Sequence, residues 1–281
     1  MKIREELIKI YNQVILDIKN GYYENSLGEE IEFPGKSKIK KDSKMYESLP
    51  PCTDHPIFSS TKIYVENNDT YLKAIEMGPK AAVLNMASHR NPGGGVSKGS
   101  RAQEEELCRR SNLLYSLYSF IGKGRDLFGF GKDQSYPIPC YGGIYSPKIS
   151  IYRRPGSYDT YDEPFFTNVI SVAGILHPEI DFTTGMMLKK YVHIAKSKIR
   201  TILRIAIINK HSKLVLGALG CGAFGNPPKH IALLFKEVLG EDEFKNSFEE
   251  VCFAILDDGN TGKAHNPEGN YKPFVDVFGT I

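Results

Sequence analysis

Four short, mostly apolar segments limit most strongly how this chain can fold. They read AAVLNM, NVISVA, LVLGAL and VCFAIL and lie at residues 81–86, 168–173, 214–219 and 251–256. Each has the length and composition of a strand that is buried on both faces of a sheet. Helical patterns alternate with them, over residues 103–118, 186–206 and about 229–239. This alternation predicts an α/β domain with a largely parallel or mixed sheet between helices.

The N-terminal part of the chain has a different pattern. Apolar residues recur at helical spacing between residues 7 and 18, and Asn20-Gly21 then predicts the end of a helix. We expect the basic run at residues 36–44 to be a solvated loop. We therefore divide the chain into an N-terminal helical extension, residues 1–60, packed on the core, and one larger domain, residues 61–281.

Composition and charge exclude several classes of protein. The 281 residues include 36 Lys and Arg against 33 Asp and Glu, so the net charge of +3 does not by itself indicate nucleic-acid binding. No apolar run is long enough for a membrane span, and the acidic, amphipathic start is a poor secretory signal. The 5 cysteines are scattered without metal-site spacing. We expect a cytoplasmic protein without disulfides, zinc or a membrane partner.

The first of two glycine loops is Gly93-Gly94-Gly95. Three adjacent glycines lose much conformational entropy on folding, so they suit a sharp turn or a close approach of the backbone. They stand between a predicted strand and a predicted helix. We expect free backbone N–H groups there that bind an anion or a sugar.

The second loop is Gly220-Cys221-Gly222-Ala223-Phe224-Gly225, which matches GxGxxG between a strand and a helix. Together, the two loops predict a diphosphate held between two strand ends of one sheet. Amide donors at helix starts suit a diphosphate without requiring Lys or Arg. Phe224 is either a platform for a ribose or base, or a core residue beneath the loop. We expect Asn226 to cap the following helix.

Acidic residues open the helix that follows the first loop, in the motif Gln103-Glu104-Glu105-Glu106. Ser100 and Gln103 fit a capping box, which places the start of the helix there. Glu104 and Glu105 differ in direction by about 100° around the helix axis. This geometry favours a division of roles in which one carboxylate orders the substrate and the other transfers protons. Repulsion between the two would raise one pKa.

These motifs, in this order, resemble those of one family. The segments LNMASHRNPGGG and RAQEEELCRRSNLLYSL, followed later by LVLGALGCGAFGNPP, are similar to the microbial-type poly(ADP-ribose) glycohydrolases. The similarity extends from the N-terminal helix to FAILDD, over most of the chain. It implies a macrodomain-like α/β fold, a mixed sheet sandwiched between helices, with residues 61–281 as the catalytic domain. No metal or other cofactor is implied, and we expect a monomer.

The resemblance also implies an activity and its residues. The reaction is hydrolysis of the ribose–ribose O-glycosidic bonds of poly(ADP-ribose), which releases ADP-ribose. Glu105 would be the general acid and base, and Glu104 would bind the ribose hydroxyls. Phe224 would pack on the distal ribose. The residues implied to bind ADP-ribose are Asn91, Gly93, Gly94, Gly95, Gln103, Gly220, Cys221, Gly222, Ala223, Phe224 and Gly225.

Two features depart from the family pattern, and other functions stay open. We expect the third acid, Glu106, to face solvent, and the sparse aromatic content between Ala81 and Val96 leaves the adenine pocket unassigned. The chain could instead be an ADP-ribose-binding macrodomain without turnover, or a hydrolase of another ADP-ribosyl linkage to protein, nucleic acid or an acyl group. The GxGxxG motif alone would also suit a nicotinamide-dependent oxidoreductase. Internal and terminal cleavage are not distinguished by the sequence.

Overall fold

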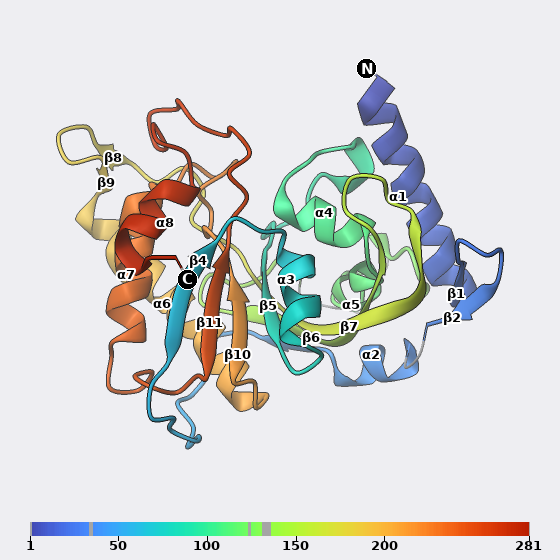
Figure 1. Ribbon diagram of the computed structural model, residues 1–281, viewed down its shortest axis with the longest axis horizontal. Helices are drawn as coiled ribbons and strands as arrows, with labels where there is room; N and C mark the ends of the chain where they lie inside the picture. Colours follow the sequence, from blue (N-terminus) through green and yellow to red (C-terminus); the bar gives the residue numbers. More distant parts are fainter. Residues whose placement is uncertain (1, 34–35, 123–124, 131–135, 281) are drawn as a thin grey trace.

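A mixed sheet organises the computed structural model, which describes residues 2–33, 36–122, 125–130 and 136–280 (Figure 1). Within these ranges, seven strands form the sheet in the order β3-β6-β7-β5-β10-β11-β4. The strands from β7 to β4 are parallel, whereas β6 and β3 are antiparallel to their neighbours. The bounds are β3 Lys44–Tyr46, β4 Lys62–Glu66, β5 Ala82–Met86, β6 Gly143–Arg153, β7 Thr160–Val172, β10 Lys213–Leu216 and β11 Glu250–Ala254.

The central strands are buried on both faces because successive side chains point in opposite directions. In β10, Leu214 and Leu216 join one apolar cluster, whereas Val215 joins a second cluster on the opposite face. β5 repeats this pattern with Leu84 and Val83. This explains why the central strands are continuously apolar in sequence.

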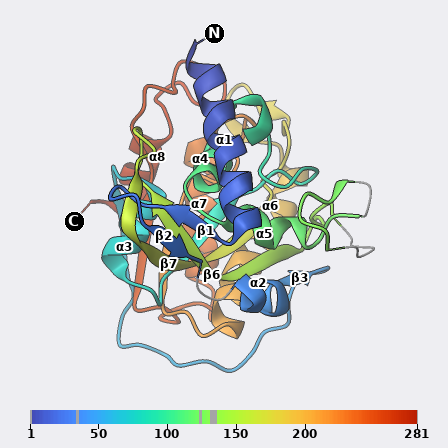
Figure 2. The same ribbon diagram turned by 90° about the vertical axis from the view of Figure 1, so that its right-hand side faces the viewer.

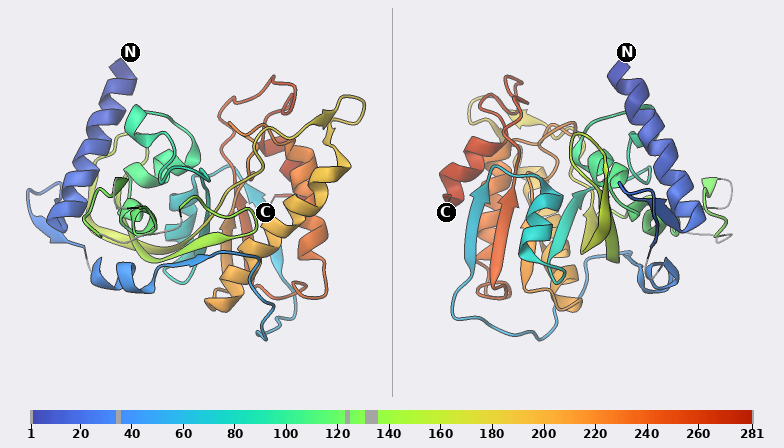
Figure 3. Two further views of the ribbon diagram at one scale, coloured as in Figure 1. Left: turned by 180° about the vertical axis from the view of Figure 1, so that it is seen from behind. Right: turned by 45° about the vertical axis from the view of Figure 1, so that its right-hand side comes forward.

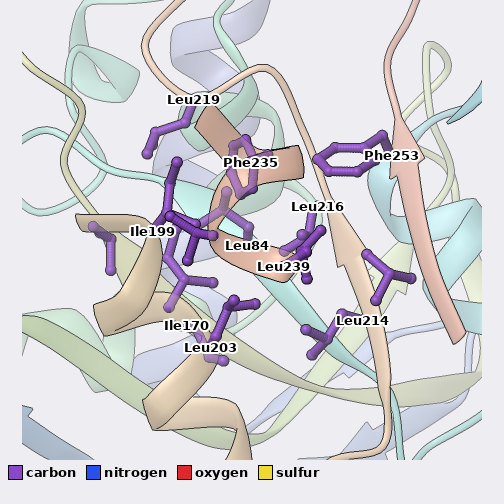
Figure 4. Packing of buried hydrophobic residues seen from close by; sticks show 14 of the residues in the cluster. Leu84, Ile170, Ile199, Leu203, Leu214, Leu216, Leu219, Phe235, Leu239 and Phe253 are labelled. Atoms are coloured by element: carbon purple, nitrogen blue, oxygen red, sulfur yellow. The ribbon is translucent and has the colours of Figure 1, made fainter. Parts of the chain in front are cut away.

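Three helices cover the first face: α6 (Lys189–Ile208), α7 (Pro228–Leu239) and α8 (Tyr271–Phe278). Figure 4 shows Ile199 and Leu203 of α6 and Phe235 of α7 beside strand residues such as Leu84 and Leu214. Viewed from behind, α6 and α7 lie on one side of the sheet and α1, α4 and α5 on the other (Figure 3).

The second face is covered by α1 (Lys2–Asn20), α3 (Thr70–Met77), α4 (Gln103–Arg109) and α5 (Leu113–Tyr118). Tyr11, Val14 and Ile18 of α1 are buried in the same cluster as Leu107 and Leu114. In Figure 2, α1 faces the viewer beside the two-stranded ribbon of β1 (Tyr22–Glu24) and β2 (Glu30–Glu32). The predicted mixed sheet between helices is confirmed, and so is the N-terminal helix. The division at residue 60 stays a prediction.

Several local predictions are wrong. The basic run forms α2 (Lys36–Asp42) and leads into β3, since Ile39 is fully buried. The segment 125–168, expected to be loops with short strands, contains most of the long antiparallel pair β6 and β7. Pro147 and a register shift between Ser146 and Ile149 interrupt the alternation of β6, which hides it in the sequence.

Two predicted helices also differ in their bounds. The helix expected at 103–118 is divided into α4 and α5, with Arg110 to Asn112 between them. The helix expected from Met186 begins at Lys189. Met186–Met187 is instead β9, which pairs with β8 (Ile180–Asp181), while a short 3-10 helix, η1, spans Val96–Lys98.

Candidate active site

A cleft of about 260 Å³ lies over the C-terminal ends of β5, β10 and β11. Loops at these ends of a parallel sheet converge, which makes this edge the usual ligand site of α/β folds. The acidic motif lines the cleft from the α4 side, and the second glycine loop lines it from the β10 side. The chain therefore brings together two motifs that are more than a hundred residues apart.

The first glycine loop is pinned to α4 through its amides. The Gly93 N–H donates to Glu104 Oε1 at 3.2 Å, and the Gly95 N–H donates to Glu105 Oε1 at 2.8 Å. The Gly94 N–H donates to the Asn91 carbonyl at 2.9 Å. The expectation that these three amides are free for a ligand is wrong, because the protein itself supplies an acceptor for each.

Glycine is required in this loop by both conformation and space. Gly93 and Gly94 have φ of 72° and 58°, in the left-handed region. A Cβ on Gly94 would lie 2.6 Å from Glu105 Oε1 and 3.0 Å from Glu104 Oε2. The backbone at Gly94 thus lies so close to both carboxylates that a side chain there would collide with them.

Glu104 is buried and has donors on both oxygens. Its Oε2 accepts the Ser88 N–H at 2.7 Å, and its Oε1 accepts the Asn85 amide at 3.4 Å in addition to the Gly93 N–H. Burial raises the pKa of Glu104 to about 8, with a smaller contribution from repulsion by Glu105, although the hydrogen bonds from Ser88, Asn85 and Gly93 lower it. Burial rather than the neighbouring charge is therefore the main cause.

Glu105 differs from Glu104 in the use of its oxygens. Its side chain is buried, and it lines the cleft. Oε1 is held by the Gly95 N–H, whereas Oε2 is buried without a hydrogen-bond partner in the described part of the chain. An unsatisfied buried carboxylate oxygen is rare unless a ligand or water completes it. Glu105 therefore combines one anchored oxygen with one unpartnered oxygen, in a residue that lines the cleft.

Gln103 has a different role from the predicted capping box. α4 begins at Gln103 as predicted, but its N-cap is Ala102, which has no side-chain cap. The Gln103 Oε1 accepts the Met86 N–H at 2.9 Å, and its Nε2 donates to the Leu84 carbonyl at 2.7 Å. Gln103 thus satisfies the backbone at the end of β5 and fastens α4 to it.

The second glycine loop is shaped by its own backbone and by Asn226. Gly220 has φ of 73°, and a Cβ there would lie 2.5 Å from the Asn226 Nδ2. Asn226 donates to the carbonyls of Ile175 and Gly220 at 2.6 and 3.0 Å, so the prediction that it caps α7 is wrong. Pro227 is the N-cap, and α7 begins with Pro228.

Four amides of this loop have no acceptor. Among the described residues these are the N–H groups of Gly220 and of the consecutive residues Gly222, Ala223 and Phe224, and all four residues line the cleft. A Cβ on Gly222 would have only the Asn260 Nδ2 near it, at 4.0 Å. Consecutive amides of this kind form an anion-binding concavity. Phe224 is partly exposed at the same wall rather than buried in the core.

The predicted residues divide between the cleft wall and its support. Those that line the cleft are Gly94, Gln103, Glu104, Glu105, Gly220, Gly222, Ala223 and Phe224. Those that lie behind or beside the wall are Asn91, Gly93, Gly95, Cys221 and Gly225. Asn91 is exposed, and its Oδ1 accepts from Arg125 at 2.8 Å. Cys221 is fully buried, and its carbonyl contacts His265 Nε2 at 3.0 Å.

Sequence reasoning missed one wall of the cleft. Its residues follow β4 and β11, and they include Asn68, Asp69, Thr70, Ile255, Leu256, Asp258 and Asn260. Ser88, beyond the end of β5, also lines the cleft. The signal that could have found them is position, since all of them lie just beyond the C-terminal ends of parallel strands.

Two kinds of feature are absent from the described ranges. Within these ranges, no group of three or more His, Cys, Asp and Glu side chains is placed to hold a metal ion. None of the helices found there has both the length and the apolar composition needed to cross a lipid bilayer.

Comparison with known proteins places these features in a family. Residues 12–154 match the family model described as microbial-type PARG, catalytic domain. No curated protein matches the chain.

Solved structures extend the similarity to the whole chain. A poly(ADP-ribose) glycohydrolase from Thermomonospora curvata shares 24% identity over 98% of this chain and 100% of that chain, with a TM-score of 0.80. A poly(ADP-ribose) glycohydrolase from Deinococcus radiodurans, in complex with ADP-ribose, shares 28% identity over 88% of this chain and 98% of that chain, with a TM-score of 0.65.

Proposed function

The chain belongs to the microbial-type PARG catalytic-domain family, and on this premise we propose that it hydrolyses the ribose–ribose O-glycosidic bonds of poly(ADP-ribose) and releases ADP-ribose. The ADP-ribose bound to the Deinococcus radiodurans relative supports the ligand class. The arrangement of carboxylates and amides in the cleft supports the chemistry.

One observation carries the proposal: the Glu105 carboxylate has one anchored oxygen and one buried oxygen without a partner in the described ranges. A proton donor in a glycosidase must be held in place and must still present an oxygen to the glycosidic bond. Glu105 meets the first condition through Oε1, and, as a residue of the cleft wall, it would meet the second through Oε2 when substrate is bound.

In the proposed first step, Glu105 Oε2 donates its proton to the glycosidic oxygen. The bond between this oxygen and the anomeric carbon breaks, and the departing ribose leaves as an alcohol. The remaining sugar has oxocarbenium-ion character. A water molecule then gives its proton to the Glu105 carboxylate and its hydroxide to the anomeric carbon, which restores the acid.

Glu104 would position the ribose rather than transfer the proton. Its raised pKa alone would favour it as the acid, since a general acid works best with a pKa near the operating pH. Geometry argues for Glu105 instead, because backbone and side-chain donors already occupy both oxygens of Glu104. Oε2 has a single donor, the Ser88 N–H, and its remaining acceptor position would then bind a ribose hydroxyl beside the scissile bond.

The second glycine loop would hold the diphosphate. Its consecutive free amides, those of Gly222, Ala223 and Phe224, would donate to the phosphate oxygens, and Phe224 would pack on the distal ribose. The bound diphosphate would also stabilise the cationic sugar of the transition state.

The test is Glu105→Gln, which keeps the shape of the side chain and removes the proton. We expect the rate of polymer hydrolysis, followed by chromatography of released ADP-ribose, to fall about a thousandfold. Calorimetry should show ADP-ribose binding within a few-fold of the parent protein. Glu163→Gln, an exposed position on β7, is the matched control and should change neither quantity.

Different outcomes contradict different parts of the proposal. Near-normal hydrolysis by Glu105→Gln would remove Glu105 as the acid. A folded parent protein that binds ADP-ribose but leaves the polymer intact would be a binding protein or would act on another ADP-ribosyl linkage. No binding of ADP-ribose by the parent protein would reject the ligand class.

A further inference from the structure

The third acid of the motif, Glu106, does not face solvent as predicted. Its carboxylate pairs with Arg109 Nη2 at 2.7 Å and accepts from the Tyr158 hydroxyl, with O···O distances of 2.7 and 2.9 Å. Only 27% of its side chain is exposed. The reason for the error is tertiary: Tyr158 comes from the connection between β6 and β7, which the sequence did not place near α4.

Arg109 makes this contact important, because its side chain is completely buried. Nη2 also donates to the Ser100 carbonyl at 2.6 Å, while Nε and Nη1 have no partner among the described residues. Glu106 is the carboxylate that pairs with Arg109 in the described ranges. A buried guanidinium deprived of its carboxylate is strongly unfavourable, so the two residues must be held together.

Tyr158 is placed at some energetic cost. It adopts φ of 61°, a left-handed conformation that is uncommon for a residue with a large side chain. Strain of this kind persists where surrounding contacts fix the residue, and it is concentrated near functional sites. Burial, followed by the hydrogen bond to Glu106, raises the pKa of Tyr158 to about 12. The hydroxyl therefore remains a donor at every pH at which the protein would work.

The contacts of Arg109 lead directly to Glu105. The Ser100 carbonyl accepts from Arg109, and the Ser100 N–H donates to the Gly95 carbonyl at 3.2 Å. The Gly95 N–H in turn holds Glu105 Oε1. Ser100 thus joins the buried arginine to the glycine loop that fixes the proposed proton donor.

We propose that Glu106, Arg109 and Tyr158 form a positioning triad that keeps the first glycine loop in register with Glu105. None of the three is proposed to touch the reacting atoms. The role in turnover rests on the proposed function, whereas the role in holding the loop does not. The β6–β7 connection, through Tyr158, would thereby help to position the first glycine loop.

The first test is Tyr158→Phe, which removes the hydroxyl and keeps the ring. We expect kcat for polymer hydrolysis to fall about three- to tenfold, the equivalent of one hydrogen bond, with ADP-ribose affinity unchanged. Hydrogen exchange of the Gly95 amide should become faster by a similar factor. Tyr161→Phe is the matched control, since Tyr161 lies in β7 just after this connection and packs its ring on Phe165 and Arg154.

The second test is a double-mutant cycle in kcat. Glu106→Gln should lower kcat more than Tyr158→Phe does, because it also leaves Arg109 without its carboxylate. In the Glu106→Gln background, Tyr158→Phe should have less than a twofold further effect, since the contact is already disrupted. A purely structural tyrosine would give independent, additive effects.

Each outcome decides the proposal. Unchanged Gly95 exchange in Tyr158→Phe, or the same change in Tyr161→Phe, overturns the triad. Additive losses of kcat overturn the coupling through Glu106. If the parent protein has no turnover, the proposed function fails, and the exchange measurement still tests the triad by itself.

Discussion

The two glycine loops have similar composition but differ in whether their backbone amides donate hydrogen bonds within the protein. In the first loop, the N–H groups of Gly93, Gly94 and Gly95 all donate within the protein, two of them to carboxylates of α4. In the second, three consecutive residues that line the cleft have N–H groups without an acceptor in the described ranges. The first loop binds acidic side chains of the protein, and we propose that the second binds the ligand.

This difference shows that a glycine-rich strand-to-helix turn does not by itself specify an anion site. The first loop leads into a helix whose first turn carries Glu104 and Glu105, so these carboxylates reach the amides before any ligand can. The second loop leads into Asn-Pro-Pro, which supplies no carboxylate. The nearest acceptors along the chain decide which use the amides have.

The largest effect should come from Gly94→Ala in the first loop. The new Cβ would collide with Glu105 Oε1 and would require φ near 58°. Displacing a proton donor by even an ångström is costly, so we expect kcat to fall about a hundredfold, with ADP-ribose affinity changed only a few-fold. Steady-state kinetics and calorimetry measure the two quantities.

Gly28→Ala is the matched control for this substitution. Gly28 also has positive φ, at 79°, but a Cβ there meets no atom within 4 Å. Gly28→Ala should lower the stability of the fold through backbone strain and leave kcat unchanged. If Gly94→Ala weakens ADP-ribose binding as strongly as it lowers kcat, the first loop is part of the cradle and the contrast fails.

A smaller effect, on ligand affinity rather than on turnover, should come from Gly222→Ala in the second loop. The backbone there is not left-handed, and the added methyl has open space, so folding should be unaffected. With ligand present, the methyl would stand between the amides and a phosphate. We expect the Kd for ADP-ribose to rise about 10- to 30-fold by calorimetry, at an unchanged melting temperature.

Gly122→Ala is the corresponding control, because it too lacks positive φ and has open space around it. It should leave both Kd and melting temperature as they are. Unaltered ADP-ribose affinity in Gly222→Ala would show that the free amides of the second loop do not hold the diphosphate.

The smallest effect is a pH dependence of folding stability, and it concerns Glu104 beside the first loop. The pKa of Glu104 is about 8 in the folded chain against 4.5 in the unfolded chain, so between these values the folded state binds the additional proton. The contribution of Glu104 to the free energy of unfolding is therefore fully present below about pH 4.5 and is lost as pH rises towards 8. The slope is at most about 1.4 kcal/mol per pH unit.

Thermal unfolding across about pH 4 to 9 measures this slope. Glu104→Gln removes the titrating group, so the difference in melting temperature between the two proteins should vary over this window and level off at either end. A constant difference would mean that Glu104 has no shifted pKa.

Much of the fold and part of the site could be predicted from sequence. The four apolar runs became β5, β11, β10 and the C-terminal part of β7, because strands buried on both faces must be continuously apolar. The glycine loops were located because φ above zero and close approach restrict composition. The long pair β6 and β7 was missed because Pro147 and a register shift break the alternation on which strand prediction depends.

The features that the sequence determined by itself are therefore local: apolar periodicity, glycine conformation and the adjacency of Glu104 and Glu105 on one helical turn. Only the tertiary structure decided which loop amides donate within the protein and which carboxylate oxygen has no partner. It also decided that the Tyr158 hydroxyl meets Glu106. The physical reason is that hydrogen-bond partners and burial depend on groups far apart along the chain. A pattern of residue types records which groups can pair, and the fold decides which of them meet.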